Sequence, residues 1–273
     1  MSRTSAEIFD INNKVVCITG AAGLIGTTIA KALKSNGAQL ILCDLDLKSL
    51  EQKFGDWPSD QVLLSAFDIT KADEIAAMVA SAKAKFGRID VLINNAAIDA
   101  KFEKDSNTDL ASVDFADFPL DKLQQSVDVN ILGTIKVTQA VVKVMKEQQS
   151  GNIINLASTY SLVAANPSLY FNEGEAFKNK PMDYLVTKSF IPNFTRYLAT
   201  HYAQQGIRCN AIAPHAIDNN HDESFKNKLK QFSPLGRMSD RTEFEGAFIY
   251  LASDASSYMT GHTMVVDGGW TAW

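Results

Sequence analysis

The sequence predicts an α/β fold built on a doubly wound parallel sheet of about seven strands, with helices on both faces. Two observations support this prediction. Short apolar, β-branched runs alternate along the chain with longer segments in which apolar residues recur at helical spacing. The short runs are apolar at nearly every position, as parallel strands are when helices cover both faces of their sheet. Hydrophobic residues make up 46% of the 273, enough for a large core, so one domain spanning residues 1–273 is expected.

The expected elements follow one another in a regular order. The expected strands are Lys14–Thr19, Gln39–Cys43, Val62–Phe67, Asp90–Ile93, Asn152–Leu156, Ile207–Ile212 and Met264–Val266. The expected helices are Leu24–Ser35, Lys71–Phe86, Asp121–Lys146, Asp183–Gln205 and Thr242–Ser253. Crossovers between parallel strands are almost always right-handed, and this rule turns the order into a doubly wound sheet.

Two polar regions interrupt the alternation of strands and helices. Asp99–Pro119 is acidic, and Thr159–Pro181 is rich in Asn, Tyr, Glu and Lys. Each region follows the carboxyl end of an expected strand, which is where open α/β sheets bind their ligands. We therefore expect both regions, 99–119 and 159–181, to be inserts that form loops around a small-molecule substrate.

Charge and composition narrow the possible partners and location. The net charge is −5, so no basic excess exists to neutralise the phosphates of a nucleic acid. No apolar run approaches the roughly 20 residues that span a bilayer, and the first residues contain no apolar signal region. Cys17, Cys43 and Cys209 lie in apolar runs and are expected to be core thiols. The expectation is a cytoplasmic protein with no nucleic-acid or membrane partner, and no metal site is predicted.

A glycine-rich loop joins the first strand to the first long helix. Gly20 allows a tight turn, Gly23 lets the backbone approach a pyrophosphate, and Gly26 lets the helix pack close to the strand. The N–H groups of the helix N-terminus, around Leu24 and Ile25, then face the phosphates. A glycine triplet alone is a weak signal, but its place between a strand and a helix is typical of a dinucleotide-binding Rossmann-type domain. The alternative is a tight turn without a ligand.

Asp44 ends the second strand and indicates which dinucleotide is bound. An acidic residue there accepts hydrogen bonds from both hydroxyls of the adenosine ribose and repels a 2′-phosphate. No Lys or Arg lies in the glycine loop or beside Asp44 in the sequence. Both facts favour NAD (NADH) over NADP. The alternative is that Asp44, or rather Asp46, merely caps the following helix.

One tyrosine is a candidate acid/base. Among the 7 tyrosines, Tyr184 alone is followed four positions later by a lysine, Lys188. This spacing puts both side chains on one face of a helix. A nearby ammonium favours the phenolate and is expected to lower the pKa of the phenol, so that Tyr184 can exchange a proton with a substrate oxygen. The alternative is an ordinary exposed helix pair.

Three further polar positions complete the candidate site. Ser158 ends an expected strand, where its hydroxyl can bond the same substrate oxygen, and the alternative is a loop or capping hydroxyl. Asn94–Ala97 ends another strand and is expected to contact the cofactor, with an Asx turn as the alternative. Asn130 is a polar residue in an apolar helix and is expected to hold a water that relays protons to Lys188, unless it is a satisfied core amide.

These motifs, taken together and in this order, resemble the short-chain dehydrogenase/reductase family over essentially the whole chain. The tail also matches at Pro234–Met238, Leu251–Asp254 and Val266–Gly269. The resemblance implies a hydride-transferring enzyme in which Tyr184 is the acid/base and Lys188 lowers its pKa and binds the nicotinamide ribose. It also implies that Ser158 positions the substrate oxygen and that Asn130 supports the relay. It assigns cofactor contacts to Asp68, Ile69, Asn95, Ala96, Ala97, Pro214, Ala216 and Ile217, beside the glycine loop and Asp44.

Several positions depart from the family pattern. Leu24 and Ala97 replace glycines, and Pro214 is followed by His215 instead of glycine. The customary Thr is missing from Ala216–Asn220. His215 is a candidate substrate contact together with Ser158, and the alternative is a plain loop histidine.

The largest departure is the spacing of 26 positions between Ser158 and Tyr184. The added residues are aromatic, amide or charged and include Tyr160, Tyr170, Phe171, Asn172, Glu173, Glu175 and Lys178. Such side chains suit a polyhydroxylated substrate, with Tyr160 and Tyr170 as expected contacts. In this respect the chain is similar to oxidoreductases that modify flagellin or surface sugars. The alternative is a loop that packs on a neighbouring subunit.

Three functions follow as hypotheses. The first is an NAD-dependent oxidoreductase acting on a secondary alcohol or ketone of a sugar or nucleotide-sugar in carbohydrate biosynthesis. The second is a reductase for an acyl carrier or small carbonyl compound, and the third is a cofactor-binding regulator without turnover. The two long helices are apolar on more than one face, which predicts a homodimer or homotetramer, and Trp270 and Trp273 are expected at a subunit contact.

Overall fold

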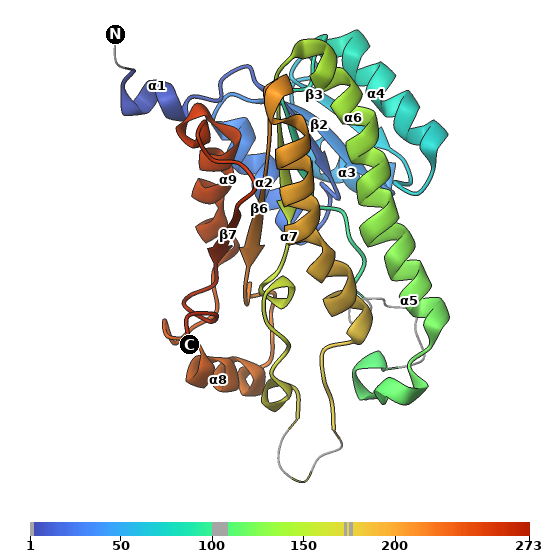
Figure 1. The fold of residues 1–273 in the computed structure, drawn as a ribbon, viewed down its shortest axis with the longest axis vertical. Coiled ribbons are helices and arrows are strands. Elements are labelled where there is room, and N and C mark those ends of the chain that lie inside the picture. The colour runs from blue at the N-terminus through green and yellow to red at the C-terminus, as the bar shows by residue number, and fades with distance from the viewer. Residues whose placement is uncertain (1–2, 100–108, 172–173, 175–176) are drawn as a thin grey trace.

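The fold is a seven-stranded parallel sheet between two layers of helices (Figure 1). The computed structural model describes residues 3–99, 109–171, 174 and 177–273. The strand order is β3-β2-β1-β4-β5-β6-β7, and every neighbouring pair is parallel. The strands are β1 (Val15–Thr19), β2 (Gln39–Asp44), β3 (Val62–Ala66), β4 (Val91–Asn94), β5 (Gly151–Leu156), β6 (Ile207–Pro214) and β7 (Thr263–Val266). The predicted doubly wound α/β sheet is confirmed.

Side chains of the central strand alternate between the two layers. Val16 and Ile18 of β1 belong to the core on one face of the sheet, while Val15 and Cys17 belong to the core on the other. The first core packs against α2 (Leu24–Ser35), α3 (Leu47–Phe54) and α9 (Glu245–Ala252), and the second against α4 (Ala72–Phe86), α6 (Thr134–Gln148) and α7 (Met182–Tyr202). All three cysteines are buried free thiols, as expected.

The long helix expected over Asp121–Lys146 is interrupted. It begins as α5 (Leu120–Ser126), continues as a π-helical segment over Val127–Gly133, and resumes as α6. A π turn marks a local insertion in a helix and often lies at a functional site. Here the segment contains Asn130.

Four other differences concern short helices. The expected helix Thr242–Ser253 begins as a 3₁₀ turn, Arg241–Phe244, before α9. The sequence-based prediction lacked α1 (Ser5–Phe9), α3 and α8 (Glu223–Phe232). In Figure 1, α8 lies at the end of the molecule toward which β6 and β7 point. No helix in the described part of the chain is long and apolar enough to cross a membrane.

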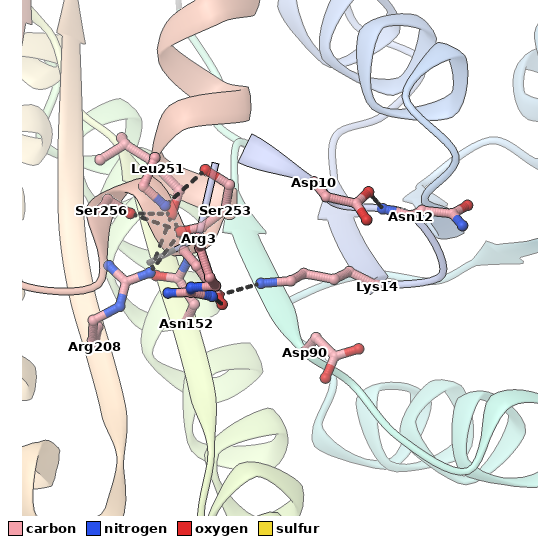
Figure 2. A network of polar contacts seen from close by, with 12 residues as sticks. Arg3, Asp10, Asn12, Lys14, Asp90, Asn152, Arg208, Leu251, Ser253 and Ser256 are labelled. Atoms are coloured by element: carbon pink, nitrogen blue, oxygen red, sulfur yellow. Dashed lines mark hydrogen bonds and ion pairs between the residues drawn. The ribbon is translucent and has the colours of Figure 1, made fainter. Parts of the chain in front are cut away.

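A polar network stabilises the opposite, amino end of the sheet (Figure 2). The carbonyl oxygen of Leu251, at the end of α9, accepts hydrogen bonds from the Asn152 amide at 2.6 Å and the Ser256 hydroxyl at 3.0 Å. The Arg208 guanidinium donates to the carbonyl of Met259 at 3.0 Å. Arg3 and Lys14 form ion pairs with Asp254 at 2.7 and 2.9 Å. A ligand site is therefore expected at the carboxyl end of the sheet.

Candidate active site

A single cleft of about 760 Å³ follows the carboxyl ends of the strands. It spans the point between β1 and β4 at which the strand order reverses, the usual ligand position in open α/β sheets. Most of the predicted site residues line it: Gly20, Gly23, Leu24, Ile25, Asp44, Asp68, Ile69, Asn95, Ala96, Ala97, Ser158, Tyr160, Tyr170, Tyr184, Lys188, Pro214, His215, Ala216 and Ile217. Gly26 and Asn130 are not among its lining residues.

The glycine loop is shaped by close backbone contacts. Gly20 has a φ of +64°, and a Cβ there would lie 2.8 Å from the Cα of Ala96. A Cβ on Gly26 would collide with the Gly20 carbonyl oxygen. The lack of a side chain at Gly26 therefore allows the helix to pack close to the strand, as expected. Gly23 is the N-cap of α2 and provides no capping side chain. The first N–H groups of α2 consequently remain available to an anion.

Asp44 combines two roles at this end of the cleft. Its carboxylate accepts hydrogen bonds from the backbone N–H of Ala22 at 2.8 Å and of Leu45 at 2.9 Å. Asp46, not Asp44, is the N-cap of α3, accepting from the N–H groups of Lys48 and Ser49. Asp44 therefore fixes the glycine loop while lining the cleft.

A basic residue reaches the glycine loop, although the local sequence showed none there. The Lys53 ammonium of α3 donates to the carbonyl oxygen of Ala22. Lys53 lies outside both the glycine loop and the immediate sequence neighbours of Asp44, where no Lys or Arg was found. Because α3 itself was not predicted, no signal placed Lys53 next to the loop.

The Asn95 amide binds the glycine loop. Its nitrogen donates to the carbonyl oxygens of Thr19 at 2.9 Å and Gly20 at 2.8 Å. The Thr19 hydroxyl in turn accepts the N–H groups of Asn95 and Ala96, both at 3.1 Å. The alternative of an Asx turn is therefore not how this amide is used, and Asn95 joins two walls of the cleft.

Tyr184, Ser158 and Lys188 meet at the other end of the cleft. A hydrogen bond joins the Tyr184 phenol to Ser158, whose hydroxyl also accepts the N–H of Tyr160 at 3.2 Å. Ser158 thus caps a 3₁₀ turn as well as contacting Tyr184. The Lys188 ammonium is buried and donates to the Leu156 carbonyl at 2.7 Å. It lies 5.9 Å from the centre of the Tyr184 ring.

The electrostatics of this cluster correct one expectation. Burial raises the pKa of Tyr184 above its usual value, and the negative charge of Asp99 raises it further, while the Ser158 hydrogen bond lowers it. Burial also lowers the pKa of Lys188 to about 8. The expectation that the Tyr184 pKa is lowered is thus wrong for this structure, because loss of hydration and the negative charge of Asp99 raise it.

Asn130 lies beneath the cluster and is fully engaged as a donor. Its amide nitrogen donates to the Ile98 carbonyl and to the Thr187 hydroxyl, both at 3.0 Å, and its oxygen accepts the N–H of Ile98 at 2.8 Å. Both N–H groups are thus used within the protein. These contacts connect the loop after β4 to Thr187 of α7, the residue before Lys188. They support a role for Asn130 in positioning Lys188.

The substrate side of the cleft has polar aromatic walls. The hydroxyls of Tyr160 and Tyr170 are 2.8 Å apart. The His215 Nδ1 lies 2.8 Å from the Thr159 hydroxyl, and the ring stacks on Trp270 with centroids 4.3 Å apart. Burial lowers the pKa of His215 to about 4, so the imidazole is neutral. Its Nε2 is buried and has no hydrogen-bond partner among the described residues.

Trp270 is part of this wall, which corrects the expectation of a subunit contact. It is 8% exposed and packs with Leu169 and Leu229, uniting the second insert, α8 and the tail. Trp273 is 80% exposed. Parts of the two inserts, residues 100–108, 172–173 and 175–176, including Asn172, Glu173 and Glu175, lie outside the described residues.

The fold and the cleft place the chain among Rossmann-like α/β proteins. A family model described as "Enoyl-(Acyl carrier protein) reductase" matches residues 20–271. The chain belongs to the short-chain dehydrogenase/reductase family, whose members are oxidoreductases that use nicotinamide cofactors.

Similar proteins span different substrates and both nicotinamide dinucleotides. The 3-oxoacyl-[acyl-carrier-protein] reductase of Thermotoga maritima is 31% identical over 95% of this chain and 98% of its own. A gluconate 5-dehydrogenase from Burkholderia cenocepacia, in complex with NADP and tartrate, has a TM-score of 0.84 at 27% identity, covering 99% of this chain and 100% of that one. A short-chain dehydrogenase from Leptospira borgpetersenii with bound NAD+ has a TM-score of 0.84 at 30% identity, covering 99% and 97%.

The residues present fit a nicotinamide dinucleotide. A Cβ on Gly23 would meet only the Gly20 carbonyl oxygen, at 3.2 Å, so no side chain fills the space beside Gly23 at the N-terminus of α2, where the phosphates would lie. Asp44 lies where the adenosine ribose would be held, and Lys188 and Tyr184 lie at the opposite end. The cleft thus offers a pyrophosphate cradle between a ribose site and a proton donor.

Proposed function

We propose that the chain is an NAD-dependent oxidoreductase that interconverts a secondary alcohol and a ketone on a sugar or nucleotide-sugar. The observation that carries the proposal is the position of Tyr184, Ser158 and Lys188 in one cleft with the glycine loop and Asp44. Bound nicotinamide supplies or accepts the hydride. A non-catalytic regulator would have no need of a buried phenol bonded to a serine hydroxyl beside a lysine.

The side chains have distinct roles in this proposal. Ser158 donates to the substrate oxygen and orients it toward Tyr184. In reduction, the Tyr184 phenol gives its proton to that oxygen, and in oxidation the phenolate takes the proton from the alcohol. Lys188 holds the nicotinamide ribose and stabilises the phenolate. Asn130 fixes the position of α7 relative to the loop that follows β4. The ribose hydroxyls would be bound by Asp44, which favours NAD over NADP.

The substrate class is proposed from the polar walls. The Tyr160 and Tyr170 hydroxyls and the unpartnered Nε2 of neutral His215 offer hydrogen bonds to substrate hydroxyls. Such a site rejects analogues that lack those hydroxyls, because the buried His215 Nε2 would then have no hydrogen bond from the substrate. A role in modifying surface or flagellin sugars, and thus in carbohydrate biosynthesis, fits these walls.

A second candidate is a reductase for acyl groups on a carrier protein. It is favoured by the similarity to the 3-oxoacyl-[acyl-carrier-protein] reductase and by three lysines on α8, next to the cleft. Within the chain, Lys226 pairs with Asp218, Lys228 donates to the Phe171 carbonyl, and Lys230 donates to Asn227. The ion pair neutralises one of the three lysines and the other two ammonium groups are engaged within the chain, so we rank this candidate second.

The deciding experiment compares the wild type with Tyr184→Phe on a matched set of substrates. The set contains 5-keto-D-gluconate, a nucleotide-sugar ketone and an acetoacetyl thioester, with NADH absorbance as the readout. We expect the wild type to reduce a polyhydroxylated ketone. This turnover should fall at least about 10²-fold in Tyr184→Phe, while NADH binding should stay unchanged. Equal turnover in both proteins would remove Tyr184 from the mechanism, and turnover of the thioester alone would favour the second candidate.

His215→Phe tests the substrate class separately. Phenylalanine keeps the stack on Trp270 but has no ring nitrogen. We expect KM for a hydroxylated ketone to rise about tenfold, and KM for its deoxy analogue to stay unchanged. Equal changes for both analogues would mean that His215 only packs.

Self-association and a cytoplasmic location are further parts of the proposal. Leu132 in the π-helical segment, and Val186 and Tyr197 on α7, are exposed on the helices expected to pair between subunits. Light scattering that shows a homodimer or homotetramer would support this part, and a monomer would contradict it.

A further inference from the structure

A partly buried ion pair lies in the cleft beside Tyr184. The Lys180 ammonium is 2.5 Å from the Asp99 carboxylate, and the two side chains are only 8% and 18% exposed. Asp99 follows β4 and Lys180 directly precedes α7, so the pair joins the two loops on either side of the cleft. Both residues line the cleft. Buried charges of this kind strongly affect neighbouring titratable groups, because little water screens them.

The pair is next to Tyr184. The Lys180 ammonium lies 4.2 Å from the centre of the Tyr184 ring, closer than the 5.9 Å of Lys188. Asp99 favours the protonated phenol, since its negative charge opposes that of a phenolate. Lys180 carries the opposite charge at the same place. The nearer of these two cations to the ring is therefore not the lysine that the sequence spacing suggested.

We propose that Lys180 is a positioning residue for the chemistry of Tyr184: its ammonium neutralises Asp99 beside the phenol, so that the proton can leave. This inference rests on the proposed role of Tyr184 as the acid/base. It assigns a function to an ion pair that the glycine loop, Ser158 and Lys188 do not explain.

Among the residues that the structure describes, the other groups around the phenol do not replace this function. Ser158 is neutral, and Tyr160 meets the Tyr184 ring edge-on at 6.5 Å with its own hydroxyl bonded to Tyr170. The neutral imidazole of His215 lies on the far side of Tyr160, with centroids 6.1 Å apart. The Lys188 ammonium donates to a backbone carbonyl. Asp183, the preceding residue, accepts the Ser126 hydroxyl at 2.6 Å.

The alternative is that the Lys180–Asp99 pair only holds the two loops together. The test has to distinguish this mechanical role from the electrostatic one. The same two loops are also joined by a backbone hydrogen bond from Asn179 to Ala111 at 2.9 Å. An ion pair between Lys178 and Asp109, at 2.8 Å, joins them as well, with side chains 45% and 56% exposed. Lys178→Met is therefore a matched control, because it removes a lysine–aspartate pair from the same connection but at the surface.

The test measures the ionisation of residue 184 directly. Tyr184 is replaced by a fluorinated tyrosine, whose phenol is a stronger acid, and its titration is followed by ¹⁹F NMR in the full chain saturated with NAD+. The variants are Lys180→Met, Asp99→Asn, the double variant and Lys178→Met. The pH dependence of kcat for alcohol oxidation is measured in the same variants with the natural tyrosine.

Neutralisation by Lys180 predicts opposite shifts. We expect the titration midpoint to rise by about one pH unit or more in Lys180→Met, to fall by a similar amount in Asp99→Asn, and to return toward the wild-type value in the double variant. Lys178→Met should leave it unchanged. If Lys180→Met does not fold, the comparison uses Asp99→Asn and the double variant. Lys180→Arg then serves as a further check, because it should keep the wild-type midpoint.

The outcomes separate this inference from the proposed function. Midpoints that do not move, or that move in the same direction in both single variants, would overturn the inference even if Tyr184 proves essential for turnover. Opposite midpoint shifts in a protein that turns over no alcohol would uphold the neutralisation of Asp99 by Lys180 beside the phenol and refute the proposed activity.

Discussion

The Asp44 carboxylate accepts the backbone N–H of Ala22 at 2.8 Å, so the residue proposed to bind the adenosine ribose also holds the glycine loop in place. A single side chain thereby links cofactor choice to loop geometry. Lys53 contacts the same residue from the other side through the Ala22 carbonyl. The Asp44 carboxylate and the Lys53 ammonium therefore both lie at this end of the cleft. The relative affinity for NADH and NADPH tests which of the two charges decides the cofactor preference.

Substitutions of Asp44 should separate its two roles. Asp44→Asn keeps an oxygen for the Ala22 N–H but removes the charge that would repel a 2′-phosphate, so NADPH affinity should rise about tenfold. Asp44→Ala also loses the loop contact and should weaken both dinucleotides. Fluorescence titration with NADH and NADPH measures both effects.

Lys53→Met is the companion variant. If the ammonium also attracts a 2′-phosphate, NADPH binding should weaken in this variant while NADH binding stays the same. Tighter binding of NADPH than of NADH by the wild type would refute the assignment of NAD.

The glycines of the loop should differ in what their substitution damages. Gly26→Ala places a methyl group against the Gly20 carbonyl and 2.8 Å from the Ala21 Cα, so the free energy of unfolding should fall by about 3 kcal/mol. Gly23→Ala meets only the Gly20 carbonyl oxygen at 3.2 Å, and should cost about 1 kcal/mol or less. Its methyl group would instead obstruct the pyrophosphate. Urea unfolding and NADH titration on both variants provide the comparison, and equal stability losses would contradict this division.

Stability should depend on pH through Lys188. Its pKa is lowered from 10.5 to about 8 by burial, so the folded state binds fewer protons than the unfolded state between those values. Stability therefore rises with pH over this window, and below pH 8 the folded protein carries the full cost of a buried ammonium. Lys188→Met should raise the free energy of unfolding by about 2 kcal/mol at pH 7, with the gain vanishing toward pH 10.

Urea unfolding between pH 6 and 10 measures this difference. Lys136→Met, which removes a comparable lysine–carbonyl bond to Thr70, is the control. A Lys188→Met protein that is less stable than wild type at pH 7 would show that the bond to the Leu156 carbonyl outweighs the cost of burial.

The two tryptophans near the end of the chain should behave differently. Trp270 is buried against His215, so Trp270→Ala should lower the free energy of unfolding by about 3 kcal/mol and raise KM for a hydroxylated substrate. Trp273→Ala, at a side chain 80% exposed, should change stability by less than about 0.5 kcal/mol. Calorimetry and steady-state kinetics test both, and an oligomer that dissociates in Trp273→Ala would restore a subunit contact for that residue.

The sheet could be predicted from the sequence because its signal is local. Each buried parallel strand is a short apolar run, and the glycine loop and the Tyr184–Lys188 spacing are visible within a few residues. Helices α3 and α8 were missed because they are short and polar overall, although their few apolar residues recur at helical spacing. The π-helical segment around Asn130 was missed for a related reason, since its residues look like those of a continuous helix.

The parts of the site that were missed depend on contacts between distant segments. Lys180 and Asp99 are 81 positions apart in the sequence, and Lys53 reaches Ala22 across 31 positions. Neither pairing has a local pattern. The direction of the Tyr184 pKa was also beyond the sequence, because it depends on how completely the surrounding chain removes water from the phenol.

The position of Trp270 has a consequence for biosynthesis. The glycine loop and β1 to β3 are made from the first 66 residues, whereas the imidazole of His215 acquires its stacking partner only when residue 270 has been added. On the ribosome, a growing chain can therefore form its phosphate-binding loop long before the wall that selects substrate exists. If the proposed site is right, nascent chains should acquire dinucleotide binding before selectivity, once the segment around Trp270 has been added.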